Sequence, residues 1–175
     1  MPDALINRLG SSAMRIYIES TIPSYVVARP ARDLLQAARQ QLTRDWWELK
    51  RNQHELFTSQ IVLDEIAAGE AEMAQQRLNL MVELTVLDLI DAAEELGDCF
   101  LQSGVMPAKA DADAAHIALA TVHRMDILVT WNCRHIANAT IVGQLRRLAL
   151  SEGFTLPEIA TPEELLGDWH DEDNE

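Results

Sequence analysis

Two short apolar runs stand out in this sequence, MRIYI at 14–18 and DILVT at 126–130. Their β-branched and aromatic residues are typical of buried strands. This pattern extends along the chain: strand-like runs at 55–59 and 84–87 alternate with helical patterns at 32–53, 60–68, 70–82, 91–102, 112–124 and 136–151. The alternation predicts an α/β fold in which helices cover both faces of a mostly parallel sheet.

Two helix starts are marked by their local sequence. Asp111 directly precedes the alanine-rich segment 112–124, where its carboxylate is placed to cap the first turn. Pro162 is placed at the first helical position of a short helix near the end of the chain.

The predicted organisation is a flexible N-terminal extension at 1–13, one folded domain at 14–167 and a disordered acidic tail at 168–175. The net charge is −14, and eight of the 28 acids fall in 158–175, where no Lys or Arg occurs. Blocks of like charge repel and resist folding. The two cysteines, Cys99 and Cys133, lie far apart, and no stretch is apolar enough to span a membrane. We therefore expect a cytoplasmic protein without a disulfide framework.

Polar side chains gather where the predicted strands end or the following helices begin. In open α/β sheets, ligands bind outside the carboxyl ends of the strands. The candidates for a site at this edge are Glu19, Ser20, Thr21, Glu65, Asp111, Asp113, His116, Asn132 and His135.

Four of these candidates are acids that suit a metal site: Glu19, Glu65, Asp111 and Asp113. Carboxylates that converge at the mouth of a sheet repel one another unless a cation lies between them. Oxygen ligands select magnesium or manganese rather than zinc. Such a cation can activate a water and neutralise charge on a phosphate, which is the chemistry of a hydrolase acting on phosphodiesters. If the protein handles a phosphate backbone, a bound metal must supply much of the positive charge, because the protein itself is acidic.

Four segments, taken in order, resemble the PIN-domain ribonuclease family: IYIESTIPSY, FTSQIVLDEIAAG, DADAAHIALA and DILVTWNCRHI. The resemblance extends from residue 14 to about residue 166 and is greatest to the VapC-like toxins of type II toxin–antitoxin systems. It implies a three-layer α/β/α sandwich and a metal-dependent endoribonuclease that hydrolyses RNA phosphodiesters. It also implies a small antitoxin as partner and a homodimer.

The resemblance implies roles for individual residues. The family's first acid, normally aspartate, matches Glu19; the second matches Glu65; and the third matches Asp113, with Asp111 as an additional acid. The hydroxyl-bearing neighbour of the first acid matches Ser20 or Thr21. Where relatives often carry a fourth acid, this chain has Asn132 and His135. The missing acid favours a single metal held by three carboxylates, Glu19, Glu65 and Asp113, over a metal pair.

Several alternatives remain open from the residues alone. The chain is also compatible with a degenerate PIN module that binds RNA or protein without cleaving, or with an unrelated α/β binding protein whose acids cap helices. His116 either contacts the site or is a buried core histidine. Asn132 either belongs to the site or caps the next helix. The six bases at 29–51 either guide RNA or form a solvated helix face.

Overall fold

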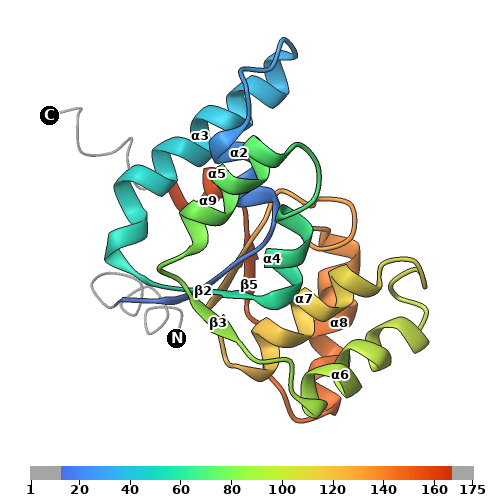
Figure 1. Cartoon of the computed structure of the whole chain (residues 1–175). Helices are drawn as coiled ribbons and strands as arrows, with labels where there is room; N and C mark the ends of the chain where they lie inside the picture. Colours follow the sequence, from blue (N-terminus) through green and yellow to red (C-terminus); the bar gives the residue numbers. More distant parts are fainter. Residues whose placement is uncertain (1–12, 167–175) are drawn as a thin grey trace, which may run out of the picture.

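The computed structural model describes residues 13–166, and its centre is a five-stranded, fully parallel sheet (Figure 1). The strand order is β3-β2-β1-β4-β5. The strands are β1 (Arg15–Ile18), β2 (Glu55–Ser59), β3 (Thr85–Leu87), β4 (Ile127–Val129) and β5 (Glu158–Ala160). Because all five strands are parallel, their carboxyl ends meet along one edge of the sheet.

The central strand β1 is the most deeply buried part of the sheet. Tyr17 pairs in register with Phe57 of β2 and with Leu128 of β4. Ile16, Tyr17 and Ile18 are all fully buried. A strand that is hydrophobic on both faces needs helices above and below it.

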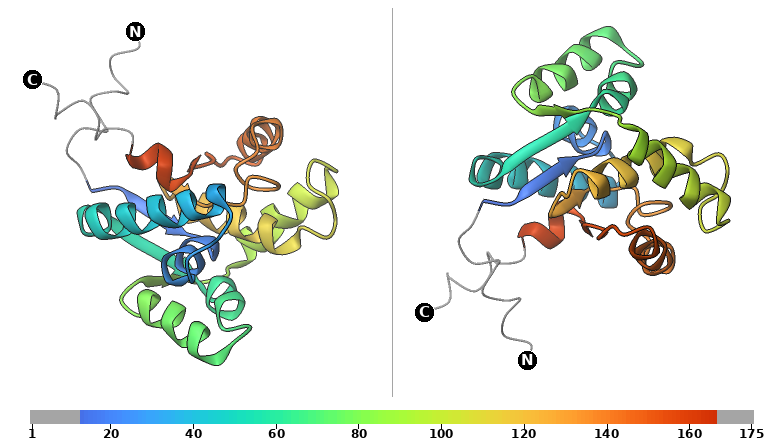
Figure 2. Two further views of the ribbon diagram at one scale, coloured as in Figure 1. Left: turned by 90° about the horizontal axis from the view of Figure 1, so that it is seen from above. Right: turned by 90° about the horizontal axis from the view of Figure 1, so that it is seen from below.

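Helices cover both faces of the sheet, as the two further views in Figure 2 show. The helices α2, α3, α5 and α9 pack together on one side, and α6, α7 and α8 pack together on the other. Their bounds are α2 (Thr21–Val27), α3 (Leu34–Lys50), α4 (Gln60–Ile66), α5 (Ala71–Met81), α6 (Asp91–Gln102), α7 (Asp111–Val122), α8 (Ala139–Ser151) and α9 (Pro162–Leu166), with a single 3-10 turn, η1 (Arg51–Gln53), after α3. The predicted α/β/α sandwich is confirmed.

The predicted elements differ from the observed ones in a few places. Helix α2, which contains Pro23, was not predicted. The proline is tolerated because it lies in the first turn, where a backbone N–H would have no acceptor within the helix. The three-residue edge strand β5 was also not predicted. The prediction that Asp111 caps α7 is wrong: Ala110 is the N-cap, and Asp111 is already the first helical residue.

The two ends of the chain lie beyond the described part. The predicted acidic tail at 168–175, and all but residue 13 of the predicted extension, fall outside residues 13–166. Within those described residues, no helix combines the length and the apolar character needed to cross a membrane.

Candidate metal centre

Glu19 follows β1 directly and lies at the carboxyl edge of the sheet. Glu19 is only 3% exposed. Both oxygens of its buried carboxylate accept hydrogen bonds. Ser20 Oγ donates to Oε1 at 2.8 Å, while Oε2 accepts from the backbone N–H of Thr21 at 3.0 Å, from Thr21 Oγ1 and from Thr130 Oγ1 at 2.8 Å. All four donors are neutral, so they fix the position of the carboxylate without cancelling its charge.

Glu65 reaches the same edge from α4, the short helix that follows β2. Ser59, the last residue of β2, caps this helix by accepting from the backbone N–H of Val62. The Glu65 side chain is 34% exposed, and its two carboxylate oxygens lie 3.1 and 3.3 Å from His116 Nε2. Burial raises the pKa of Glu65, but the hydrogen bond and charge of His116 and the hydroxyl of Ser20 outweigh it, so the net pKa is lowered. Glu65 is therefore ionised at neutral pH.

His116 lies on the buried face of α7 and links Glu65 to the centre of the sheet. Its side chain is 1% exposed. Its Nδ1 is 2.8 Å from the hydroxyl of Tyr17, which in turn is 2.7 Å from Ser59 Oγ. Burial raises the pKa of Tyr17 strongly, the Ser59 hydrogen bond lowers it, and the negative charges of Glu19 and Glu65 raise it. Tyr17 therefore keeps its proton and serves as a neutral hydrogen-bonding group.

These contacts bring Glu19, Glu65 and His116 together. One ligand atom from each of the three side chains lies within 4.8 Å of the others. Two carboxylates and one imidazole at this spacing form a donor set that a divalent cation can bridge. A cation would also relieve the repulsion between the two carboxylates. The residues present therefore fit a divalent metal.

Asp113, the third predicted carboxylate, lies one helical turn before His116 on α7 but has other partners. Its Oδ1 accepts from Asn132 Nδ2 at 2.9 Å, and its Oδ2 is 2.8 Å from His135 Nδ1. In the described part of the chain, the group of ligand atoms within 4.8 Å contains Glu19, Glu65 and His116 but not Asp113. The structure thus divides the predicted site into two neighbouring clusters.

Asn132 and Thr130 connect the two clusters. The backbone N–H of Asn132 donates at 2.9 Å to Thr130 Oγ1, the same hydroxyl that donates to Glu19. Asn132 Oδ1 accepts from the backbone N–H of His135 at 3.1 Å. The amide therefore caps the turn after β4, whereas α8 is capped by Asn138.

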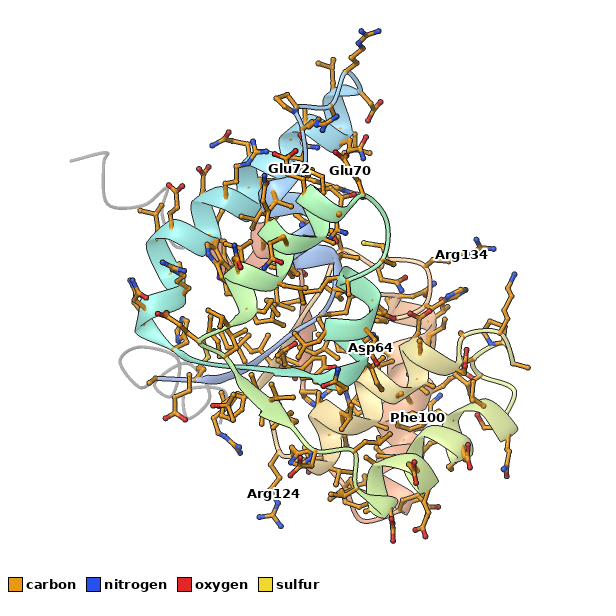
Figure 3. All side chains as sticks on the ribbon, in the orientation of Figure 1. Asp64, Glu70, Glu72, Phe100, Arg124 and Arg134 are labelled. Atoms are coloured by element: carbon orange, nitrogen blue, oxygen red, sulfur yellow. The ribbon has the colours of Figure 1, made fainter. Side chains whose placement is uncertain are left out.

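Two further acids point away from both clusters. Asp111 is exposed and lines a separate cavity of about 410 Å³ with Leu101 and Ala115, which lies against α6. Asp64, labelled in Figure 3, neighbours Glu65 on α4, but its carboxylate accepts from Gln60 at 2.8 Å. Both are matched controls for the acids of the clusters.

Sequence reasoning missed Thr130 and Tyr17. Thr130 comes directly after three apolar residues at the end of the run DILVT, so the motif does contain this signal. Tyr17 lies inside the first strand, where an aromatic residue is typical of the core. Its role depends on His116, which is 99 residues away in the sequence.

Most of the six bases at 29–51 have structural partners. Arg44 donates to the carbonyl oxygens of Val26 and Ala28, and Arg39 lies over the ring of Trp131, 5.2 Å from its centroid. Arg29 forms an exposed ion pair with Glu70. These contacts support the interpretation of the stretch as a solvated helix face more than as a dedicated RNA guide.

The hydrogen-bond donors around Glu19 are positioned for a side chain of the length of glutamate. We expect Glu19→Asp to destabilise the protein, because a side chain shorter by one methylene cannot reach both threonine hydroxyls, and a buried hydroxyl left unpaired costs about 1–3 kcal/mol. Urea unfolding measures the change. The matched control is Glu72→Asp on the exposed first turn of α5, where we expect a change within about 0.5 kcal/mol. A Glu19→Asp variant as stable as the wild type would show that the pocket adjusts to the shorter aspartate.

Comparisons with known proteins show the fold but no sequence family. No protein-family model matches the chain, and no curated protein matches its sequence. Among solved structures, it is similar to a chain of VapBC2 from Rickettsia felis bound to a DNA fragment from their promoter. The identity is 15%, the match covers 85% of this chain and 98% of the other, and the TM-score is 0.53. The likeness supports a PIN-like arrangement of the sheet and helices.

Proposed function

We propose that this protein is a metal-dependent endoribonuclease that hydrolyses RNA phosphodiesters and is the toxin of a toxin–antitoxin pair. The observation that carries the proposal is the convergence of Glu19, Glu65 and His116 at the carboxyl edge of a parallel sheet. A PIN-like fold supports it, because ligands of such sheets bind at this edge.

The proposed partners follow from the same resemblance. The similar structure is a VapBC2 complex with promoter DNA, which supports a small antitoxin as partner for this chain. A homodimer and a cytoplasmic location complete the proposal.

In the proposed site, Glu19 and Glu65 hold magnesium or manganese. When bound, the cation supplies positive charge that polarises the scissile phosphate and acidifies a water. The four donors around Glu19 keep its carboxylate in place. Asp113 holds the ring of His135 through Nδ1, which leaves Nε2 as the atom that can bind a phosphate oxygen or move a proton. We assign Asp113 this positioning role as an alternative to the ligand role that the family resemblance implies.

Cleavage of single-stranded RNA tests the proposal. The purified protein should degrade RNA in the presence of manganese, and removal of the metal with EDTA should abolish the activity, because neither cluster contains a lysine or arginine that could meet the phosphate in its place. Cleavage that persists in EDTA would exclude a metal-dependent nuclease.

A second candidate function is a PIN-like module that binds RNA or protein without cleaving. It is favoured by Asn132, which stands where relatives often have an acid, and by Asp113, whose two oxygens are already engaged. Metal binding without cleavage on any RNA would support this candidate over the nuclease.

Manganese should raise the melting temperature of the protein. A ligand that binds only the folded state stabilises it by about 2.7 kcal/mol at a concentration 100-fold above the Kd. For a chain of this length, that free energy corresponds to a shift of roughly 5–10 °C. Differential scanning fluorimetry with and without manganese measures the shift. Protein in buffer with EDTA and no added metal provides the baseline. A melting temperature unchanged at millimolar manganese would count against the site.

A further inference from the structure

We propose that His116 is itself a ligand of the metal through Nε2, that Tyr17 and Ser59 hold its ring for this role, and that the site therefore prefers manganese to magnesium. The inference rests on the proposed function, and it names which cation the centre selects and which residues select it.

The first argument is the position of the His116 ring. The side chain is 1% exposed, and Nε2 faces Glu65 at 3.1 Å. One ring nitrogen of His116 and one carboxylate oxygen each of Glu19 and Glu65 lie within 4.8 Å of one another. A cation held by the two carboxylates therefore lies within reach of an imidazole nitrogen.

The second argument is the chain of hydrogen bonds behind the ring. The Tyr17 hydroxyl has one hydrogen, so it donates either to His116 Nδ1 or to Ser59 Oγ. In the first direction, Ser59 donates to Tyr17, Tyr17 donates to Nδ1, and Nε2–H donates to Glu65. In the second direction, Nδ1–H donates to Tyr17, Tyr17 donates to Ser59, and Nε2 presents a lone pair.

The two directions correspond to the site without and with a cation. A lone pair on Nε2 that faces two carboxylates is unfavourable unless a cation lies between them. The first direction therefore suits the protein without metal, and the second makes Nε2 a ligand. Metal-binding histidines are commonly held in this way, by a partner at the other ring nitrogen.

The third argument is the chemistry of the donor set. Magnesium prefers oxygen ligands and keeps several waters, whereas imidazole suits transition-metal ions. Manganese accepts carboxylates as magnesium does, and it lies above magnesium in its affinity for nitrogen donors. A site with one buried imidazole beside two carboxylates should therefore bind manganese more tightly than magnesium.

Pulsed electron paramagnetic resonance on the manganese-loaded, full-length protein tests the inference directly. We expect modulation from a directly coordinated nitrogen, and we expect it to change when the protein is labelled uniformly with ¹⁵N. Bound manganese without nitrogen modulation would overturn the inference and leave the proposed nuclease intact. Failure to bind manganese at all would overturn both.

Variants identify the nitrogen and its support. His116→Gln should abolish the nitrogen modulation while its amide can still donate to Glu65. Tyr17→Phe keeps the ring in the core but removes the partner of Nδ1, and losses of this kind weaken metal affinity by about 10–100-fold. We expect that loss for manganese and little change for magnesium, measured by isothermal titration calorimetry. A merely structural Tyr17 would lower the melting temperature without changing the preference between the two ions.

His123→Gln is the matched control, because this histidine is the C-cap residue of the same helix, away from the metal group, and its Nε2 is bonded to the carbonyl of Asp88. It should keep both the modulation and the manganese preference. If His116→Gln fails to fold, the wild-type spectrum and Tyr17→Phe still decide the matter. Retention of the full manganese preference in Tyr17→Phe would overturn the role of the hydrogen-bond chain.

Discussion

Replacing Glu65 with glutamine is expected to abolish manganese-dependent RNA cleavage. The amide keeps the size of the side chain but removes the anionic oxygen that a divalent ion prefers. A catalytic metal contributes several kcal/mol to transition-state stabilisation, so we expect a loss of about 100-fold or more in the cleavage rate. Because the Glu65 side chain is 34% exposed, the fold should survive the substitution. Cleavage of a labelled single-stranded RNA under single-turnover conditions measures the effect.

The neighbouring acid Asp64 provides the control for Glu65. It lies on the same short helix, but its carboxylate bonds Gln60 and is not part of the metal group. Asp64→Asn should therefore cleave RNA at the wild-type rate and bind manganese with unchanged affinity. If Glu65→Gln is as active as Asp64→Asn, the proposed centre is wrong.

Replacing Asp113 with asparagine is expected to have the second large effect. Both partners of this carboxylate, Asn132 Nδ2 and His135 Nδ1, approach as donors. Asparagine has only one acceptor oxygen, so its NH2 group must face one of these two donors. An NH2 group that faces His135 would force the imidazole proton from Nδ1 onto Nε2. In serine-protease triads the same substitution lowers kcat about 10⁴-fold through the wrong tautomer. We expect at least a 100-fold loss of cleavage here, on the order of 3 kcal/mol.

Asp111→Asn is the matched control for this effect, because Asp111 lies two residues away on α7 and faces the cavity beside α6. A double-mutant cycle with His135→Ala separates the two roles of Asp113. If Asp113 acts through His135, the double variant should be no slower than the slower single variant. If Asp113→Asn instead lowers manganese affinity while His135→Ala retains activity, Asp113 is a metal ligand, as the family resemblance implies.

Much of the fold could be predicted because its signals are local. The strand at 55–59 and the helix at 91–102 have the bounds observed for β2 and α6. Gly69 and Gly153, both at positive φ, follow helices α4 and α8, where glycine ends a helix without strain. The failures are also local: α2 carries a proline in its first turn, and β5 has only three residues at the edge of the sheet.

The candidate site was only partly predictable. Glu19 and Asn132 could be found because each lies just after a strand-like run, and Glu65 because it lies in the short helix that follows one. The interpretation of His116 as a buried histidine agrees with its 1% exposure, but burial alone does not reveal its contacts with Glu65 and Tyr17. A side chain can be both part of the core and part of a site, and the sequence does not distinguish these cases.

The sequence by itself determined the alternation of strands and helices, and it placed an acid directly after the central strand, because hydrophobic periodicity and helix-ending residues act over a few neighbours. Only the tertiary structure decided which side chains meet there. His116 and Asp113 lie three residues apart on α7. The orientation of that helix against the sheet places His116 in contact with Glu65 and Asp113 in contact with His135. Thr130 reaches Glu19 across 111 residues because β1 and β4 are neighbours in register. Such contacts depend on strand order and helix packing, which are fixed by burial of the whole core rather than by any local pattern.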